Sequence, residues 1–261
     1  MPDHLGINST DARIAIIMGT PQRVPLLASF FDKPLQLTDR RGFLIYEAFL
    51  ENHKILFVSS GIGGPSTAIV IEELIDLGLE IIIRVGTCGS LLPSIRPGDI
   101  VISSGAIRAE GTSRQYIDSG YPAIPDPILL NRIINAASAN GIAFHLGITH
   151  CKDAYYLEKP GKQLSPTEAG KQWEIWRNAN ALATEMEAAV LFVLGSIRGI
   201  TTAAIFINVG KEPQEHLDTL ENIVKLLKHS LPATVETLPG KSSKTAPQED
   251  SSFLDHSGKK E

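Results

Sequence analysis

Two arginines in this sequence follow buried strands and stand beside glycine-containing turns. In RVGTCGS, Arg84 comes directly after the apolar run EIII and precedes Gly86 and Thr87; in MGTPQR, Arg23 follows Gly19 at the end of RIAIIM. A guanidinium at the end of a buried strand must meet an anion, because an unpaired buried charge is costly. Two arginines, a threonine hydroxyl and backbone amides suit a phosphate dianion. The pattern therefore predicts a phosphate site.

A third glycine turn, SSGIGGPS at Gly61, also ends a strand. In an open α/β sheet, ligands bind beyond the carboxyl ends of the strands, where glycine lets backbone N–H groups approach an anion. For any one turn an alternative stays open, namely that the glycine is an ordinary loop residue and the arginine pairs with a surface carboxylate. The sequence contains neither a Walker P-loop nor G-x-G-x-x-G, so nucleoside triphosphates and dinucleotides lose their main support as ligands.

An acidic pair opens a second candidate region in TEMEAA, where Glu185 and Glu187 flank Met186 before the apolar run AAVLFVL. Residues two positions apart cannot share one helix face. A carboxylate at a helix N-terminus is favoured by the helix dipole, so the pair could simply begin a helix. An ionised carboxylate is also well suited to accept hydrogen bonds from a sugar diol. The residues alone leave both interpretations open.

The elements that must position these residues alternate along the chain. Strand-length apolar runs are RIAIIM, KILFVSS, EIIIRV, DIVISS, HLGITH and TTAAIFIN. Helical patterns lie between and after them, at about residues 24–31, 67–78, 127–140, 187–198 and 217–229. Strand, glycine turn, helix and strand in succession predict an α/β fold with a largely parallel sheet and helices on both faces.

Composition limits the classes of protein that fit. A chain of 261 residues with 43% hydrophobic residues can bury the core of one large domain, which we assign to residues 1–238. Residues 239–261 are rich in Ser, Lys and acidic residues and predict a disordered C-terminal tail. The net charge of −5 argues against nucleic acid as a partner, and no apolar run is long enough for a membrane span. Two distant cysteines, without a signal-peptide pattern, predict a cytoplasmic protein without a disulfide scaffold.

Several segments together carry a resemblance to a known family. In order and spacing over roughly residues 4–208, the sequence resembles the nucleoside phosphorylases of the uridine phosphorylase type; the segments are HLGI, MGTPQRV, SSGIGGPSTAIVIEEL, RVGTCGSL, RPGDIVI, IRAEGTS and TEMEAAVLFVLGSIRGI. The resemblance implies a single-domain, three-layer α/β/α sandwich around a mixed, largely parallel sheet. It also implies phosphorolysis of a nucleoside to free base and (deoxy)ribose 1-phosphate. It implies a homo-oligomer as well, a hexamer built as a trimer of dimers that share active sites.

The resemblance also implies roles for individual residues. The phosphate positions are Gly19, Arg23, Arg84 and Thr87, with Arg41 supplied by a neighbouring subunit; the ribose positions are Met186, Glu187 and a neighbour's His4. Arg84, Glu187 and Arg23 are the expected catalytic residues. Inorganic phosphate is a co-substrate, and no cofactor is implied. No metal site is predicted either, since Gly42 stands where some members carry an acidic cation ligand.

The base-binding region departs from the uridine-specific pattern. Tyr155 and Tyr156 match the family's aromatic pair, but the Gln-x-Arg that reads uracil is not in register. Direct alignment places Lys159 and Gly161 there, and Gln163 or Lys162 can substitute if the loop carries an insertion. INVGKE likewise lacks the Ser-Asp of the purine-type relatives. We therefore expect a phosphorylase of uridine or a related pyrimidine nucleoside with relaxed base selectivity. The alternatives are a purine nucleoside phosphorylase, a nucleosidase, and a catalytically silent nucleoside-binding homologue.

Overall fold

The computed structural model describes residues 3–158, 173–209 and 216–231. Its strands are β1 Ile14–Met18, β2 Asp32–Arg40, β3 Phe43–Leu50, β4 His53–Ser59, β5 Ile81–Ser90, β6 Ile100–Ala109, β7 His145–Lys152, β8 Ala183–Glu185 and β9 Thr201–Asn208. Its helices are α1 Arg23–Ala28, α2 Gly64–Asp76, α3 Thr112–Tyr116, α4 Pro127–Ala139, the 3-10 helix η1 Tyr155–Glu158, α6 Ala188–Arg198 and α7 His216–Ser230; residues 173–178 are also helical. The predicted tail, residues 239–261, lies outside the described residues.

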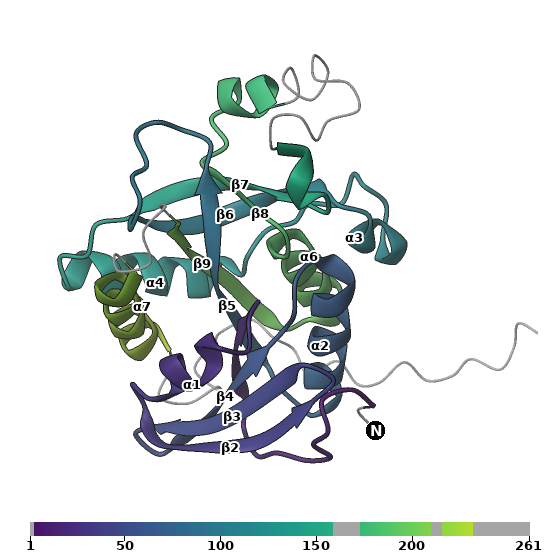
Figure 1. The fold of residues 1–261 in the computed structure, drawn as a ribbon, viewed down its shortest axis with the longest axis vertical. Helices are drawn as coiled ribbons and strands as arrows, with labels where there is room; N and C mark the ends of the chain where they lie inside the picture. The colour runs from purple at the N-terminus through teal and green to yellow at the C-terminus, as the bar shows by residue number, and fades with distance from the viewer. Residues whose placement is uncertain (1–2, 159–172, 210–215, 232–261) are drawn as a thin grey trace, which may run out of the picture.

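The strands form one mixed nine-stranded sheet in the order β2-β3-β4-β1-β5-β8-β7-β6-β9 (Figure 1). Parallel pairs join β1 to β4 and β5, β5 to β9, and β7 to β6 and β8. Because β9 pairs with both β6 and β5, the strands from β5 to β9 close on themselves into a partial barrel. The predicted mixed α/β fold is confirmed. The predicted three-layer α/β/α sandwich is confirmed only in part, because the sheet partly closes into a barrel.

The segment RVGTCGS is a strand, so the prediction of a glycine turn there is wrong. Residues 86–88 continue the parallel pairing of β5 with β9, up to Cys88 opposite Asn208. On its other edge, β5 pairs with β1 only as far as Arg84 and with β8 only from Gly89 onward. Residues 85–88 therefore lie where β1 and β8 separate along one edge of β5. Such a switch point is where α/β sheets bind ligands.

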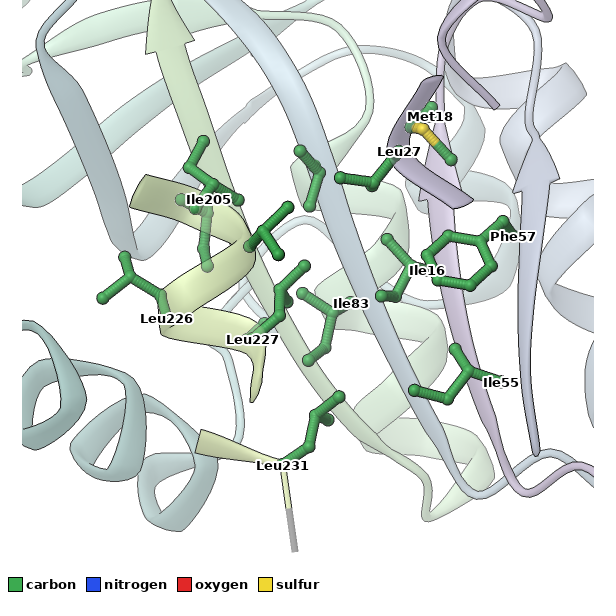
Figure 2. Close-up of a cluster of buried hydrophobic side chains, with 14 of the residues drawn as sticks. Ile16, Met18, Leu27, Ile55, Phe57, Ile83, Ile205, Leu226, Leu227 and Leu231 are labelled. Atoms are coloured by element: carbon green, nitrogen blue, oxygen red, sulfur yellow. The ribbon is translucent and has the colours of Figure 1, made fainter. Parts of the chain in front are cut away.

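Two hydrophobic clusters, one on each face of the sheet, hold this arrangement in place. One packs β1, β5 and β9 against α1, α4 and α7; Figure 2 shows Ile205 and Ile83 of the strands near Leu226 and Leu227 of α7, and Ile16 beside Phe57. The other cluster packs the opposite face against α2 and α6. Each fully buried side chain of this kind stabilises the fold by about 1.5–3 kcal/mol. The strand ends that carry the candidate residues are therefore rigidly supported.

The hairpin of β2 and β3 was not predicted from the sequence. Arg41 and Gly42 form its two-residue turn, with φ values of 54° and 83°, and Arg40 pairs with Phe43 across it. Positive φ at both central positions is typical of a type I′ turn, whose twist matches that of the flanking strands. β2 is exposed along nearly all its length, so it lacks the alternating apolar pattern that reveals a strand.

No helix in the described ranges has the length and apolar character needed to cross a bilayer.

Candidate active site

Arg84 lies buried at the switch point, with only 3% of its surface exposed. Its Nη2 donates a hydrogen bond to Glu187 Oε2, and its Nε lies 3.5 Å from Glu185 Oε2. Among the described residues, neither Nε nor Nη1 has a hydrogen-bond partner. Buried polar groups nearly always have one, and since Nε already faces the Glu185 carboxylate, it is Nη1 that indicates a place for an anion. Arg84 is buried, as the sequence predicts, and its role at an anion site stays a prediction.

Gly86 makes room for this guanidinium. A β-carbon built on Gly86 would lie 2.9 Å from Arg84 Nη2 and 3.0 Å from both Arg84 Cζ and Phe206 Cδ1. Arg84 Cζ itself lies 5.6 Å from the centre of the Phe206 ring, a cation–π distance. Glycine is therefore required here for a close approach and not for a turn.

The two glutamates of TEMEAA have different positions: Glu185 caps a helix, and Glu187 faces the candidate site. Glu185 Oε2 accepts hydrogen bonds of 2.9 Å from the N–H groups of Glu187 and Ala188, so Glu185 caps the start of α6. Burial raises the pKa of Glu185, and the charge of Arg84 opposes that rise. Glu187 instead faces the site, where its carboxylate accepts the N–H of Gly63 at 2.6 Å as well as Arg84. Met186, between them, is half-buried.

The glycine loops after β1 and β4 meet beside Arg84. The N–H of Ser60 donates to the carbonyl of Met18 at 2.6 Å, and a β-carbon on Gly19 would lie 3.5 Å from the carbonyl oxygen of Gly61. The second loop leads to Gly63, whose φ of 86° starts α2. The first helical amides of α2 thus add partial positive charge near Glu187.

Arg23, at the start of α1, is the second cation of this region. Burial lowers its pKa, and the positive charge of Arg84 lowers it further, so the two guanidinium groups are electrostatic neighbours. Arg23 also lines a pocket of about 210 Å³ together with Gly86 and Thr87. The other lining residues are apolar, namely Met18, Leu26, Leu27, Val85, Ile207, Leu217 and Leu220.

Thr87 is placed differently from Arg84. Side chains alternate along a strand, so Thr87 lies on the face of β5 that carries Val85, and Arg84 lies on the other. Arg23 lies close enough to each of them to line the pocket beside Thr87 and to feel the charge of Arg84. The structure therefore brings together Gly19, Arg23, Arg84 and Glu187, with Thr87 on the pocket side.

The expected base-binding residues are only partly described. Tyr155 and Tyr156 lie in η1 with 51% and 63% of their surface exposed, and their rings meet edge to face with centroids 5.3 Å apart. Gln163 lies outside the described residues. The aromatic pair is therefore exposed beyond the end of β7, as a stacking surface would require.

His4 and Arg41, the two residues expected to act on a neighbouring subunit, lie in different parts of the chain. His4 Nδ1 contacts Glu73 Oε1 at 2.6 Å, and the N–H groups of Asp3, His4 and Leu5 all donate to the same carboxylate. Glu73 lies ten residues beyond Gly63 along α2, about 15 Å at the helical rise per residue. Arg41 is exposed at the tip of the β2–β3 hairpin. His4 therefore does not reach the chain's own candidate site, whereas the hairpin tip lies against the end of β4, where Ser59 Oγ donates a hydrogen bond to the carbonyl of Gly42 at 2.9 Å.

Sequence reasoning missed two residues at the end of β7. Lys152 is buried, and its Nζ lies 5.7 Å from the ring centre of Tyr155 and 5.1 Å from that of Trp173. His150 packs between Trp173 and Trp176, with ring centroids 5.1 and 5.3 Å away. The signal was present: in HLGITHCK, as in EIIIRV, a cation follows a buried strand.

Comparison with known proteins places these features in context. The family model described as "Phosphorylase superfamily" matches residues 13–235. A uridine phosphorylase of Treponema pallidum is 39% identical over 211 residues, which cover 80% of this chain and 82% of the relative. A uridine phosphorylase of Salmonella typhimurium is 30% identical over 243 residues, covering 89% and 95%. A guanosine phosphorylase of Halorubrum lacusprofundi is 37% identical over 203 residues, covering 77% and 80%.

Proposed function

The chain belongs to the phosphorylase superfamily, and we propose that it is a nucleoside phosphorylase. Phosphate cleaves the N-glycosidic bond of uridine or a related pyrimidine nucleoside and yields free base and (deoxy)ribose 1-phosphate. The observation that carries this proposal is the buried guanidinium of Arg84, whose Nη1 has no hydrogen-bond partner in the described part of the chain, next to the carboxylate of Glu187. The pair supplies a cation for phosphate and an anion for sugar hydroxyls in one place.

Phosphate is held by Arg84 and Arg23, by the backbone at Gly19 and by the hydroxyl of Thr87. The two neighbouring arginines repel each other, and a bound phosphate dianion would neutralise both charges. Arg41 of a second subunit adds a third cation. Thr87 reaches the anion from the pocket that it lines together with Arg23.

Glu187 holds the ribose. Its two oxygens already accept hydrogen bonds from Gly63 and Arg84, but a carboxylate offers about four acceptor positions, so the 2′- and 3′-hydroxyls can be held as well. Met186 packs against the sugar, and His4 of a second subunit reaches the 5′-hydroxyl. The fixed position of Glu187 at the start of α6 orients the sugar above the phosphate.

Catalysis follows from this arrangement. As the bond to the base weakens, the ribose gains oxocarbenium character, and the phosphate beneath it stabilises the cation and then attacks C1′. No side chain needs to form a covalent intermediate. The arginines keep the phosphate within reach of C1′, and burial strengthens these electrostatic contacts.

The choice of base has a second candidate. The relatives named as uridine phosphorylases support a pyrimidine nucleoside, whereas the guanosine phosphorylase of Halorubrum lacusprofundi supports an oxopurine. The exposed tyrosines offer a stacking surface that either base can use. We infer uridine as the better substrate, with relaxed selectivity toward other nucleosides. Gln163→Ala should alter this selectivity more than Lys159→Ala.

A nucleoside panel with and without phosphate tests the proposal. Release of free base should require phosphate, produce a pentose 1-phosphate, and continue when arsenate replaces phosphate. Equal release without phosphate would identify a nucleosidase. Binding without turnover would identify a silent homologue, and exclusive cleavage of guanosine or inosine would overturn the pyrimidine assignment.

A further inference from the structure

Lys152 is a buried cation for which the family resemblance implies no role. It ends β7 with 7% of its surface exposed, and its Nζ lies within 6 Å of the ring centres of both Tyr155 and Trp173. Burying an ammonium group costs free energy unless a partner or a ligand compensates for it. The negative charge of Glu185 favours the charged form of Lys152. Aromatic faces add cation–π attraction.

The strand register places Lys152 beside the sugar-binding residues. Cys151 of β7 pairs with Glu185 of the parallel strand β8. The residues that follow them, Lys152 and Met186, are therefore neighbours. Glu185 in turn lies 3.5 Å from Arg84. Lys152 therefore lies between the proposed ribose contact and Tyr155, the proposed stacking residue for the base.

We propose that Lys152 is a specificity-determining residue whose ammonium donates a hydrogen bond to a carbonyl oxygen of the nucleobase. The inference rests on the proposed phosphorolysis. An ammonium has three donors and no acceptor, so it favours a base with a carbonyl at that position, such as uracil or a 6-oxopurine, over one with an amino group there. The ammonium of Lys152 thus takes the place of the guanidinium of the uracil-reading arginine, which this sequence does not have in register.

The same contact assists the reaction. The electron pair of the glycosidic bond leaves with the base, while a phosphate oxygen supplies the pair for the new bond to C1′. The charge on the departing base spreads from its ring nitrogen to its carbonyl oxygens, where the ammonium stabilises it. Lys152 stays protonated throughout, and the proton brought by hydrogen phosphate ends on the base or in solvent.

Protonation of Lys152 supplies a pH signature. Burial lowers the pKa of Lys152 to about 8, although the negative charge of Glu185 opposes this shift. The ammonium is therefore present below about pH 8 and is lost as the pH rises through that value. The pH profile of kcat/KM reports the pKa values of groups in the free enzyme. For nucleosides whose base offers a carbonyl oxygen to Lys152, such as uridine, kcat/KM should therefore fall on the alkaline side, near pH 8.

Lys152→Met removes the charge while keeping a long side chain. We expect kcat/KM for uridine to fall on the order of 10²-fold, as for loss of one preorganised donor, with little change for cytidine. The matched control is Lys228→Met, because Lys228 also lies over an aromatic ring, 5.1 Å from the centre of Phe31, but on α7. The control should keep the wild-type ratio of uridine to cytidine activity.

Lys152→Arg is the second variant, since its guanidinium stays charged through alkaline pH. It should keep more activity on uridine than Lys152→Met and lose the fall near pH 8. Wild-type selectivity and an unchanged pH profile in both variants would overturn the inference while leaving phosphorolysis intact. Should the wild-type protein show no phosphate-dependent cleavage of any nucleoside, the proposed function itself would fail. If Lys152→Met does not fold, the profile of Lys152→Arg decides.

Discussion

At the scale of single residues, the site depends on a guanidinium held by two carboxylates with different tasks. Glu185 is committed to the amides that start α6, while Glu187 is bound by Gly63 and Arg84 and faces the candidate site. A spacing of two residues allows this division, because the chain turns from strand to helix between them. The sequence indicated that the two side chains could not share a helix face, but not which of them caps the helix.

Arg84→Ala should cost about 2–5 kcal/mol of transition-state stabilisation, as loss of a buried charge-assisted contact does. Arg84→Lys should recover only part of it, because a lysine cannot place two donors as the guanidinium fork does. Steady-state kinetics at varied phosphate concentration measure both. Arg13→Ala, which removes an exposed arginine paired with Glu80, is the control. A near-normal rate for Arg84→Ala would remove this residue from the site.

His150 should make the free energy of unfolding depend on pH. Burial lowers its pKa from 6.5 to about 4, and the charge of Lys152 adds to the effect. Its stabilising contribution is present above pH 6.5 and is lost as the pH falls toward 4, by up to about 3 kcal/mol. Urea unfolding between pH 7 and 4 should show a shallower loss for His150→Phe than for the wild type. Identical slopes would show that other groups govern acid unfolding.

At the scale of elements, β5 is the strand on which the site depends. Its apolar half was predicted from EIIIRV, but its continuation through two glycines was not, because glycine in a strand has no side chain to reveal burial. Pairing with β9, more than 110 residues later in the chain, keeps the glycine-containing half of β5 extended. β8 was also missed, since three residues are too few for a periodic pattern. The strands RIAIIM, KILFVSS, DIVISS, HLGITH and TTAAIFIN were predicted correctly because long apolar runs carry their own signal.

Gly86→Ala should damage the site more than it damages the fold. The added methyl group would displace the guanidinium of Arg84 or the ring of Phe206, both about 3 Å away. We expect a rise in the KM for phosphate of roughly 10- to 100-fold, with a destabilisation of about 1–3 kcal/mol, as for overpacked cores. Gly89→Ala in the same strand is the matched control, because its methyl group would meet only Thr184 Cγ2 at 3.7 Å. Equal effects of the two changes would contradict the proposed role of Gly86.

At the scale of the whole molecule, His4 lies on Glu73 of α2, away from the chain's own Arg84, and Arg41 is exposed at a hairpin tip, where both can serve a neighbouring site as proposed. Subunits with only Arg41→Ala and subunits with only Arg84→Ala should then complement each other. Random mixing of two-subunit units that share sites restores about a quarter of the sites. Activity of the refolded mixture, compared with each variant alone, measures this. Full activity of the wild-type protein at dilutions that yield monomer would contradict site sharing.

The separation of β1 and β8 along one edge of β5 also has a consequence for how such a protein can change over generations. The proposed anion and sugar contacts come from the β1, β4 and β5 side and the start of α6, whereas the exposed Tyr155 and Tyr156 come from beyond the end of β7. Substitutions of these two tyrosines can therefore be inherited without disturbing the first group. A library randomised at positions 155 and 156 should yield variants with new base preferences that still consume phosphate.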